Sequence, residues 1–252
     1  MQDNVSNDIP QINSPIKKAE LHKFFGPYFG EFTLPDDVVE ALIKMTDSLL
    51  EDSESLNFGH SLAGVIKEEI FVYKEDMISF GVNEILEGCF KSYVVNATKM
   101  HSFHKDSFKY ESMINSAWIV SQFENEYNPV HSHSGCNISA VLYLKTPEVK
   151  GRRGVHKNKM DTDSDISFLY NASSSRDMDV LDRGHLNFAP SEGMLYIFPS
   201  YLLHTVYPFV GGEERRSLAF NAVYRIKEGN EIIYGLPGPV SSYEYLEGRK
   251  KG

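Results

Sequence analysis

After about residue 112 the chain becomes a series of short apolar segments, each bounded by turn-forming residues, and few architectures accommodate such a pattern. Segments of this kind, with alternating or continuous apolar residues, are typical of an antiparallel β-sandwich or barrel. A parallel α/β sheet would instead place a helical pattern between successive strands. The segments that we expect to form strands are Ala117–Phe123, Ile138–Leu144, Ile166–Tyr170, Met194–Phe198, His204–Tyr207 and Ser217–Ile226.

Helical periodicity precedes this half of the chain. A helix is predicted to begin near Leu34, because Pro35 suits a first helical turn and four apolar residues follow at helical spacing. These residues are Val38, Leu42, Met45 and Leu49. A second helical stretch is predicted over about residues 76–95, and Gly81 and Gly88 lower its helix propensity. Helices followed by strands favour a mainly β domain whose helices pack on one sheet.

The length of 252 residues accommodates one β-rich domain with helical additions or two small domains, and we favour one domain. We expect residues 1–20 to be a polar arm and residues 21–252 to be a single domain. Within that domain the helical part covers about residues 34–100 and the β part about residues 115–228. The polar, charged stretch of about residues 149–184 is predicted to be an insertion, either a functional lid or disordered, and its position between the candidate site residues favours a lid.

Charge and cysteine content restrict the classes of partner and compartment. The net charge of −10 argues against binding to nucleic acid, which needs a basic face. Only two cysteines occur, Cys89 and Cys136, without the spacing of a zinc site or a disulfide framework. No apolar run is long enough to cross a membrane, and the N-terminus lacks the pattern of a signal peptide. We therefore expect a cytoplasmic protein without membrane contacts, whose oligomeric state the sequence does not indicate.

A pair of histidines precedes the predicted strand Ile138–Leu144. His131 and His133 are two residues apart, so on an extended segment both imidazoles project to the same side and can chelate one metal ion. Such a pair also occurs by chance on the surface of a sheet. A third histidine, His204, follows the apolar run Met194–Phe198 after Pro199. Three neutral imidazoles are good ligands for Fe(II), zinc or nickel and leave coordination positions open for substrates.

A candidate anion site lies eleven residues beyond His204. In a strand, Arg215, Ser217, Ala219 and Asn221 share one face, so that a guanidinium and a hydroxyl point in the same direction. Arginine presents paired N–H donors that match a carboxylate, and the serine adds another donor. A dicarboxylate that chelates a metal at one end could bind here at the other. The alternative interpretation is an edge strand with salt bridges.

Together these segments resemble the 2-oxoglutarate/Fe(II) oxygenase superfamily, in particular its prolyl-hydroxylase-like branch of bacteria and their viruses. The resemblance covers about residues 118–224 and combines several motifs. They are His131-Ser132-His133-Ser134-Gly135, the strand Ile138–Leu144, Glu192-Gly193 through Phe198-Pro199-Ser200 to His204, and Glu214-Arg215-x-Ser217 to Asn221.

The resemblance implies a double-stranded β-helix, a jelly-roll or cupin-like fold, with the N-terminal helices packed on one sheet. It also implies that His131, His133 and His204 bind Fe(II), that Arg215 and Ser217 hold the distal carboxylate of 2-oxoglutarate, and that Tyr143 lines that pocket. The sequence departs from the superfamily at His133, where a carboxylate is usual, and Glu124 or Glu126 could supply an acid instead.

The activity implied is a dioxygenase that uses 2-oxoglutarate and O2 to hydroxylate a C–H bond of a protein side chain or small molecule, with succinate and CO2 as co-products. Halogenation is disfavoured, because His133 occupies the position that a halogenase leaves vacant. One alternative is a three-histidine cupin-like dioxygenase or isomerase that does not use 2-oxoglutarate, and Arg215 and Ser217 count against it. The other is a non-catalytic β-helix binding module.

Overall fold

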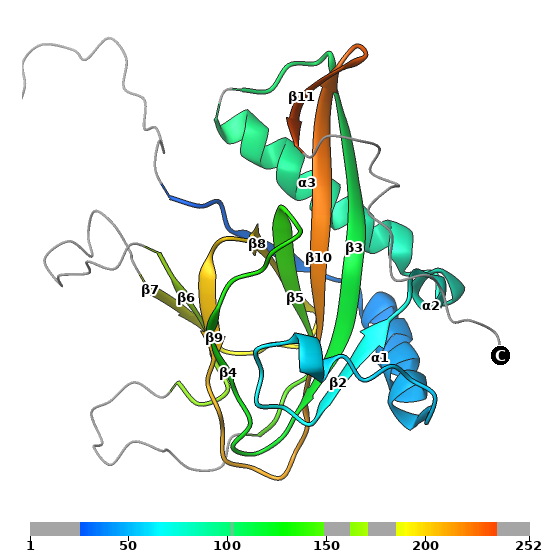
Figure 1. Ribbon diagram of the computed structural model, residues 1–252, viewed down its shortest axis with the longest axis vertical. Coiled ribbons are helices and arrows are strands. Elements are labelled where there is room, and N and C mark those ends of the chain that lie inside the picture. The colour runs from blue at the N-terminus through cyan, green and yellow to red at the C-terminus, as the bar shows by residue number, and fades with distance from the viewer. Residues whose placement is uncertain (1–25, 102, 149–161, 171–184, 236–252) are drawn as a thin grey trace, which may run out of the picture.

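The computed structural model describes residues 26–101, 103–148, 162–170 and 185–235. In these residues the helices and strands form three layers: helices, a large sheet and a small sheet (Figure 1). The helices are α1 (Asp36–Glu51), the short 3-10 turn η1 (Gly59–Ser61), α2 (Lys74–Ser79) and α3 (Asn83–Met100). The strands are β1 (Gly30–Thr33), β2 (Glu68–Val72), β3 (Phe108–Gln122), β4 (Asn128–His131), β5 (Ile138–Lys145), β6 (Ile166–Leu169), β7 (His185–Phe188), β8 (Met194–Pro199), β9 (Leu203–Val206), β10 (Arg215–Glu228) and β11 (Glu231–Gly235).

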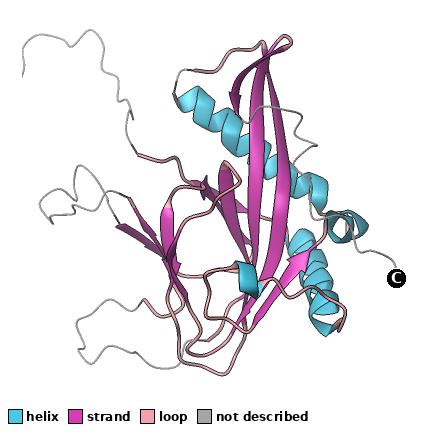
Figure 2. Cartoon of the chain, in the orientation of Figure 1, coloured by secondary structure: helices cyan, strands magenta, loops and turns pink. Residues whose placement is uncertain are grey.

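Two antiparallel sheets make up the β part in the described residues. The large sheet has the strand order β1-β8-β5-β10-β3-β2, and β11 pairs with the far end of β10. The small sheet has the order β4-β9-β6-β7. Figure 2 shows the long strands β3 and β10 standing between the helices on one side and the small sheet on the other. This arrangement is the double-stranded β-helix predicted from the sequence.

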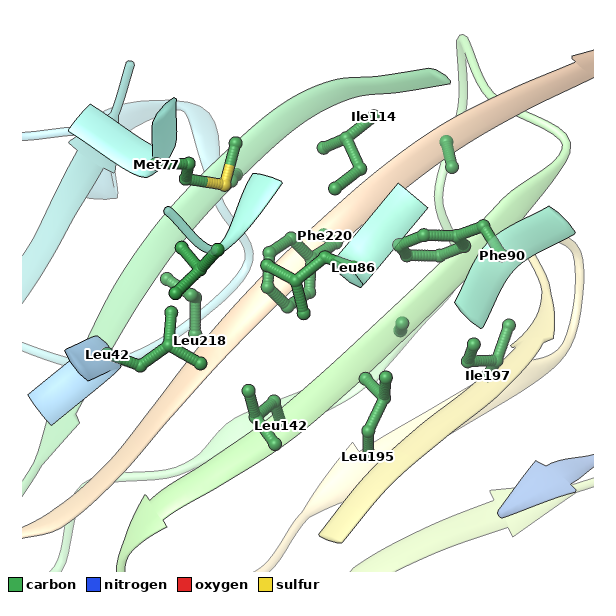
Figure 3. Close-up of a cluster of buried hydrophobic side chains, with 14 of the residues drawn as sticks. Leu42, Met77, Leu86, Phe90, Ile114, Leu142, Leu195, Ile197, Leu218 and Phe220 are labelled. Carbon is green, nitrogen blue, oxygen red and sulfur yellow. The ribbon is translucent and has the colours of Figure 1, made fainter. Parts of the chain in front are cut away.

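The helices bury their apolar faces on the outer face of the large sheet. The four residues predicted to form the buried stripe of α1, namely Val38, Leu42, Met45 and Leu49, are all buried. In Figure 3, Leu86 and Phe90 of α3 lie against Phe220 of β10, and the ring centroids of the two phenylalanines are 6.1 Å apart. The sequence prediction that the helices cover one sheet is confirmed.

The central strands are apolar on both faces because each face packs against a different layer. In β5, Ala140 and Leu142 belong to the core beneath the helices, whereas Val141 and Tyr143 belong to the core between the two sheets. The strand β8 alternates in the same way. The continuous apolar runs of the sequence therefore mark strands enclosed between two layers.

The predicted second helix over residues 76–95 is wrong in one respect. It is two helices, α2 and α3, which meet at Gly81 with a φ of 72°. That backbone conformation is open to glycine at little cost and interrupts a right-handed helix. Gly88, by contrast, lies inside α3 without breaking it.

The strand prediction found every long central strand and the short strands β6 and β9, and it missed the other short ones. Strands β1, β2, β4, β7 and β11 were not predicted, and β3 and β10 are longer than expected. The two histidines His131 and His133 do not lead into β5. His131 ends β4, which belongs to the small sheet, whereas β5 belongs to the large one.

Parts of two further predictions lie outside the described residues. The predicted arm of residues 1–20 does so entirely, as does most of the predicted insertion of residues 149–184. The middle of that insertion contains β6, which pairs with β7 and β9, so this part is an integral strand. Among the helices that the structure describes, none has the length and apolar character needed to span a membrane.

Candidate metal centre and anion site

His131 and His204 are brought together by strand pairing. Strands β4 and β9 are antiparallel neighbours, and His131 and His204 are opposite each other in their register. Residues opposite each other on one face of such a pair have their side chains in contact. The two imidazole centroids are accordingly 4.2 Å apart, although 73 positions separate the residues in the sequence.

His133 completes the group from the loop after β4. Its backbone N–H donates to the carbonyl oxygen of Ser200, which ties this loop to the end of β8. Its ring lies 5.3 Å from that of His131 and 5.1 Å from that of His204. One ligand nitrogen from each ring lies within 4.8 Å of the others, the arrangement of a group that could hold a metal ion.

Each imidazole is oriented by a hydrogen bond from its Nδ1. The acceptors are the carbonyl oxygen of Pro129 for His131, the side-chain oxygen of Asn221 for His133, and the carbonyl oxygen of Leu202 for His204. Because these oxygens accept, each Nδ1 carries the proton and each Nε2 presents a lone pair. Such oxygen partners are the usual second shell of metal-binding histidines.

The three rings favour their neutral form. Desolvation is the main cause in each case, and it lowers the pKa of His133 to about 4 and that of His204 to about 3. The pKa of His131 is lowered as well, again mainly by burial. The Nε2 atoms of His133 and His204 are 3.2 Å apart. Two facing lone pairs at that distance repel each other, and a cation between the rings would remove the repulsion.

The histidines line a cavity of about 300 Å³ together with one face of β10. Arg215, Ser217, Ala219 and Asn221 contribute to its wall, as the period of two in the sequence predicted. The residues between them face the helices, and Leu218 and Phe220 are part of that core. The cavity thus joins the imidazole group to the predicted anion site.

Arg215 is buried in this wall without an acidic partner among the described residues. It is 1% exposed, and its Nη1 donates to the Gln122 side-chain oxygen at 2.8 Å while its Nη2 donates to the Tyr143 hydroxyl at 3.1 Å. Its Nε has no hydrogen-bond partner. A buried guanidinium is costly unless an anion compensates it, so this residue is suited to bind a carboxylate from a ligand.

Of the other predicted site residues, one lines the cavity and three do not. Ser217 lines the cavity, whereas Tyr143 is fully buried behind Arg215 and does not form part of the lining. Glu124 and Glu126 do not join the imidazole group. The carboxylate of Glu126 instead accepts hydrogen bonds from the backbone N–H groups of Lys67 and Phe123.

Sequence reasoning missed several residues of the site. Trp118 stacks on His133 with centroids 5.7 Å apart, and Gln122 and Asn221 position Arg215 and His133. Asn221 had been placed on the correct face of β10 but without a role. Glu69 also lines the cavity, and no motif pointed to it because β2 was not predicted.

Residues 116–221 match the model of a protein family described as "Putative 2OG-Fe(II) oxygenase". The match contains all three histidines, Arg215 and Ser217. It agrees with the resemblance stated from the motifs. Comparison with curated protein sequences gave no match.

Solved structures of oxygenases share the fold. The α-ketoglutarate-dependent epimerase SnoN of nogalamycin biosynthesis is 12% identical, with a TM-score of 0.51 over 89% of this chain and 86% of its own. The carbocyclase SnoK of the same pathway is 10% identical, with a TM-score of 0.50 over 84% and 90%. A prolyl-4-hydroxylase of Pseudomonas putida is 16% identical, with a TM-score of 0.46 over 77% and 91%. The first two support the double-stranded β-helix assignment.

Proposed function

We propose that this chain is a 2OG-Fe(II) oxygenase, because residues 116–221 match the model of that family, and that it hydroxylates a C–H bond of a protein side chain or small molecule. Its Fe(II) ligands are His131, His133 and His204. The observation that carries the proposal is a single cavity that contains three converging imidazoles and a buried arginine without an acidic partner among the described residues.

The donor set fits a divalent transition metal. Imidazole nitrogens suit Fe(II), and the hydrogen bonds to Pro129, Asn221 and Leu202 leave the Nε2 of each ring free. Three neutral ligands leave both positive charges of the ion uncompensated by the protein. A dianionic co-substrate such as 2-oxoglutarate supplies the missing negative charge.

The anion site fits the other end of 2-oxoglutarate. Arg215 is held by Gln122 and by Tyr143, whose ring also lies 4.9 Å from the guanidinium carbon. This support fixes the guanidinium before any ligand arrives, which reduces the entropy lost on binding. We assign Arg215 and Ser217 to the distal carboxylate, and Tyr143 to the positioning of Arg215.

The bound Fe(II), 2-oxoglutarate and O2 together supply the oxidant that converts a substrate C–H bond to C–OH, with release of succinate and CO2. The protein orients the ligands and keeps the site dry. Trp118 stacks on His133, and Phe168 and Phe198 pack against His204 at centroid distances of 5.8 and 5.0 Å. These rings shield the imidazoles from water.

One absorbance measurement and one product measurement test the proposal. Anaerobic protein with Fe(II) should develop a weak visible charge-transfer band when 2-oxoglutarate is added, and admission of O2 should produce succinate. His204→Ala should abolish both signals, while His60→Ala, a change at an exposed histidine outside the cavity, should leave them intact. Absence of the band and of succinate in the unaltered protein would shift the assignment to a cupin-like enzyme that does not use 2-oxoglutarate.

Arg215→Ala separates the binding of 2-oxoglutarate from the binding of iron. Removing a partner of a buried carboxylate costs about 2 to 5 kcal/mol, so the 2-oxoglutarate concentration at half-maximal band intensity should rise roughly 30-fold to several thousand-fold. Iron binding, measured by equilibrium dialysis, should persist. Equal loss of iron and 2-oxoglutarate binding would contradict the assigned role.

We also propose that residues 21–252 form one oxygenase domain and that the protein functions in the cytoplasm. The free thiols of Cys89 and Cys136 support a reducing compartment.

A further inference from the structure

A second buried ionisable group faces the same cavity. Glu69 of β2 is 1% exposed and lines the cavity wall. Its Oε2 has no hydrogen-bond partner, and no residue in the described part of the chain forms an ion pair with it. A buried carboxyl oxygen without a donor is unfavourable, whereas the oxygens of its neighbour Glu126 accept backbone hydrogen bonds. Glu69 is therefore the acid of this pair that lacks a partner.

The surroundings of Glu69 combine aromatic rings with a close-fitting loop. Phe58 and Trp118 line the cavity with it, and their ring centroids are 5.9 Å apart. The loop before β2 approaches its carboxylate at two glycines. A Cβ at Gly59 would lie 3.2 Å from Oε2, and a Cβ at Gly64 would lie 3.2 Å from Oε1. Carboxylate and aromatic faces together are the chemistry that binds a cation.

Strand register separates this acid from the proposed 2-oxoglutarate site. Glu69 of β2 is opposite Val120 of β3, and Val120 is opposite Ser217 of β10. Two strand spacings make the backbone separation between Glu69 and Ser217 about 10 Å. The cavity thus has a positive wall at Arg215 and an acidic side chain at Glu69.

We propose that Glu69, Phe58 and Trp118 form the subsite for a protonated amine or guanidinium of the prime substrate. This inference rests on the proposed function and names the substrate class that the enzyme selects. We call these three residues the Glu69 subsite. A cation compensates the charge of the Glu69 carboxylate and packs on the two rings, whereas a neutral donor supplies only a hydrogen bond.

The size of the cavity indicates how much of the substrate enters. Ligand cavities run from about 300 to 1,000 Å³, and this one, at about 300 Å³, also has to admit 2-oxoglutarate. Only a side chain or a comparably slender group fits in addition. A lysine or arginine side chain of a peptide has that shape, and the net charge of −10 attracts a cationic partner.

Two pairs of peptide libraries test the inference. In each pair one fixed position is charged or neutral at nearly constant shape: lysine against norleucine, and arginine against citrulline. The readout is succinate formation above the substrate-free rate, with Fe(II), 2-oxoglutarate and O2 present. We expect at least tenfold greater stimulation by a charged library than by its neutral counterpart.

Glu69→Gln keeps the shape of the side chain and removes its charge. We therefore expect the ratio of stimulation by a charged library to stimulation by its neutral counterpart to fall to about one. The matched control is Glu68→Gln, because Glu68 is the adjacent, exposed residue of the same strand and should retain the preference. Circular dichroism verifies that both variants are folded.

The outcomes separate the inference from the function on which it rests. Equal stimulation by the members of each pair, or no stimulation by either charged library while substrate-free succinate formation is measurable, overturns the Glu69 subsite. A preference that survives in Glu69→Gln overturns it as well. No succinate under any condition refutes the proposed function instead.

Discussion

Replacing Glu69 by glutamine should stabilise the metal-free protein, and the gain should depend on pH. Burial, with a smaller contribution from the charge of Glu126, raises the pKa of Glu69 from 4.5 to about 7. The side chain is 1% exposed, so solvent does little to screen this effect. Glutamine has almost the same shape and no charge, so it isolates the cost of ionisation.

The magnitude follows from the two pKa values. Each pKa unit is worth about 1.4 kcal/mol, so ionised Glu69 destabilises the folded state by about 3 kcal/mol relative to its protonated form. Because the folded-state pKa is the higher one, the protonated form stabilises the fold fully below pH 4.5. That contribution decreases as the pH rises and is lost above about pH 7. The free energy of unfolding of Glu69→Gln, relative to the unaltered protein, should therefore increase between pH 4.5 and about pH 7 and stay constant above that.

The assay is urea unfolding in the presence of a chelator, at half-unit intervals from about pH 4.5 to 8.5. At each pH the free energy of unfolding of the unaltered protein is subtracted from that of Glu69→Gln. Titrations common to the two proteins cancel in this difference. Glu68→Gln serves as the control and should show no pH-dependent difference, because Glu68 is exposed. A flat difference for Glu69→Gln across this range would refute the reasoning that the carboxyl is desolvated.

Two further substitutions probe the supports of the site. Asn221→Ala removes the acceptor that orients His133, and the loss of such a second-shell partner should weaken Fe(II) binding about 10- to 100-fold, measured by competition with a chelator of known affinity. Unchanged affinity would show that Asn221 does not orient a ligand. Arg216→Ala removes a buried guanidinium that bonds to Glu214 and to Asp47 of α1, and should lower the free energy of unfolding by about 3 kcal/mol in urea titrations. A loss below about 1 kcal/mol would show that this contact between sheet and helix contributes little.

Local patterns were sufficient to predict the long strands and one face of the site. The period of two in β10 placed Arg215, Ser217 and Asn221 on a common face, and all three line the cavity. The apolar stripe of α1 was predicted correctly, because a helix that packs on a sheet needs one buried face. Of the short strands, β6 and β9 were predicted and β1, β2 and β4 were not, because four or five residues carry little pattern that distinguishes a strand from a loop.

The partners of the site residues could not be read from the sequence. Glu69 carried no signal in the sequence and Arg215 was recognised only as a candidate anion site, and the burial of both is not visible until the sheets are assembled. Only then is one buried beneath the loop before β2 and the other set against Tyr143 and Gln122. Burial of a charge is a property of the whole fold, and no local periodicity encodes it.

The sequence by itself determined the strand alternation, the residue types able to bind a metal and a carboxylate, and the motif order that predicted an oxygenase. Tertiary structure decided where these residues meet: the pairing of β4 with β9 sets His131 opposite His204, and the order β10-β3-β2 sets Glu69 two strands from Ser217. The physical reason is that side-chain direction follows from local backbone geometry, whereas proximity between distant segments follows from which strands pair and which faces are buried together.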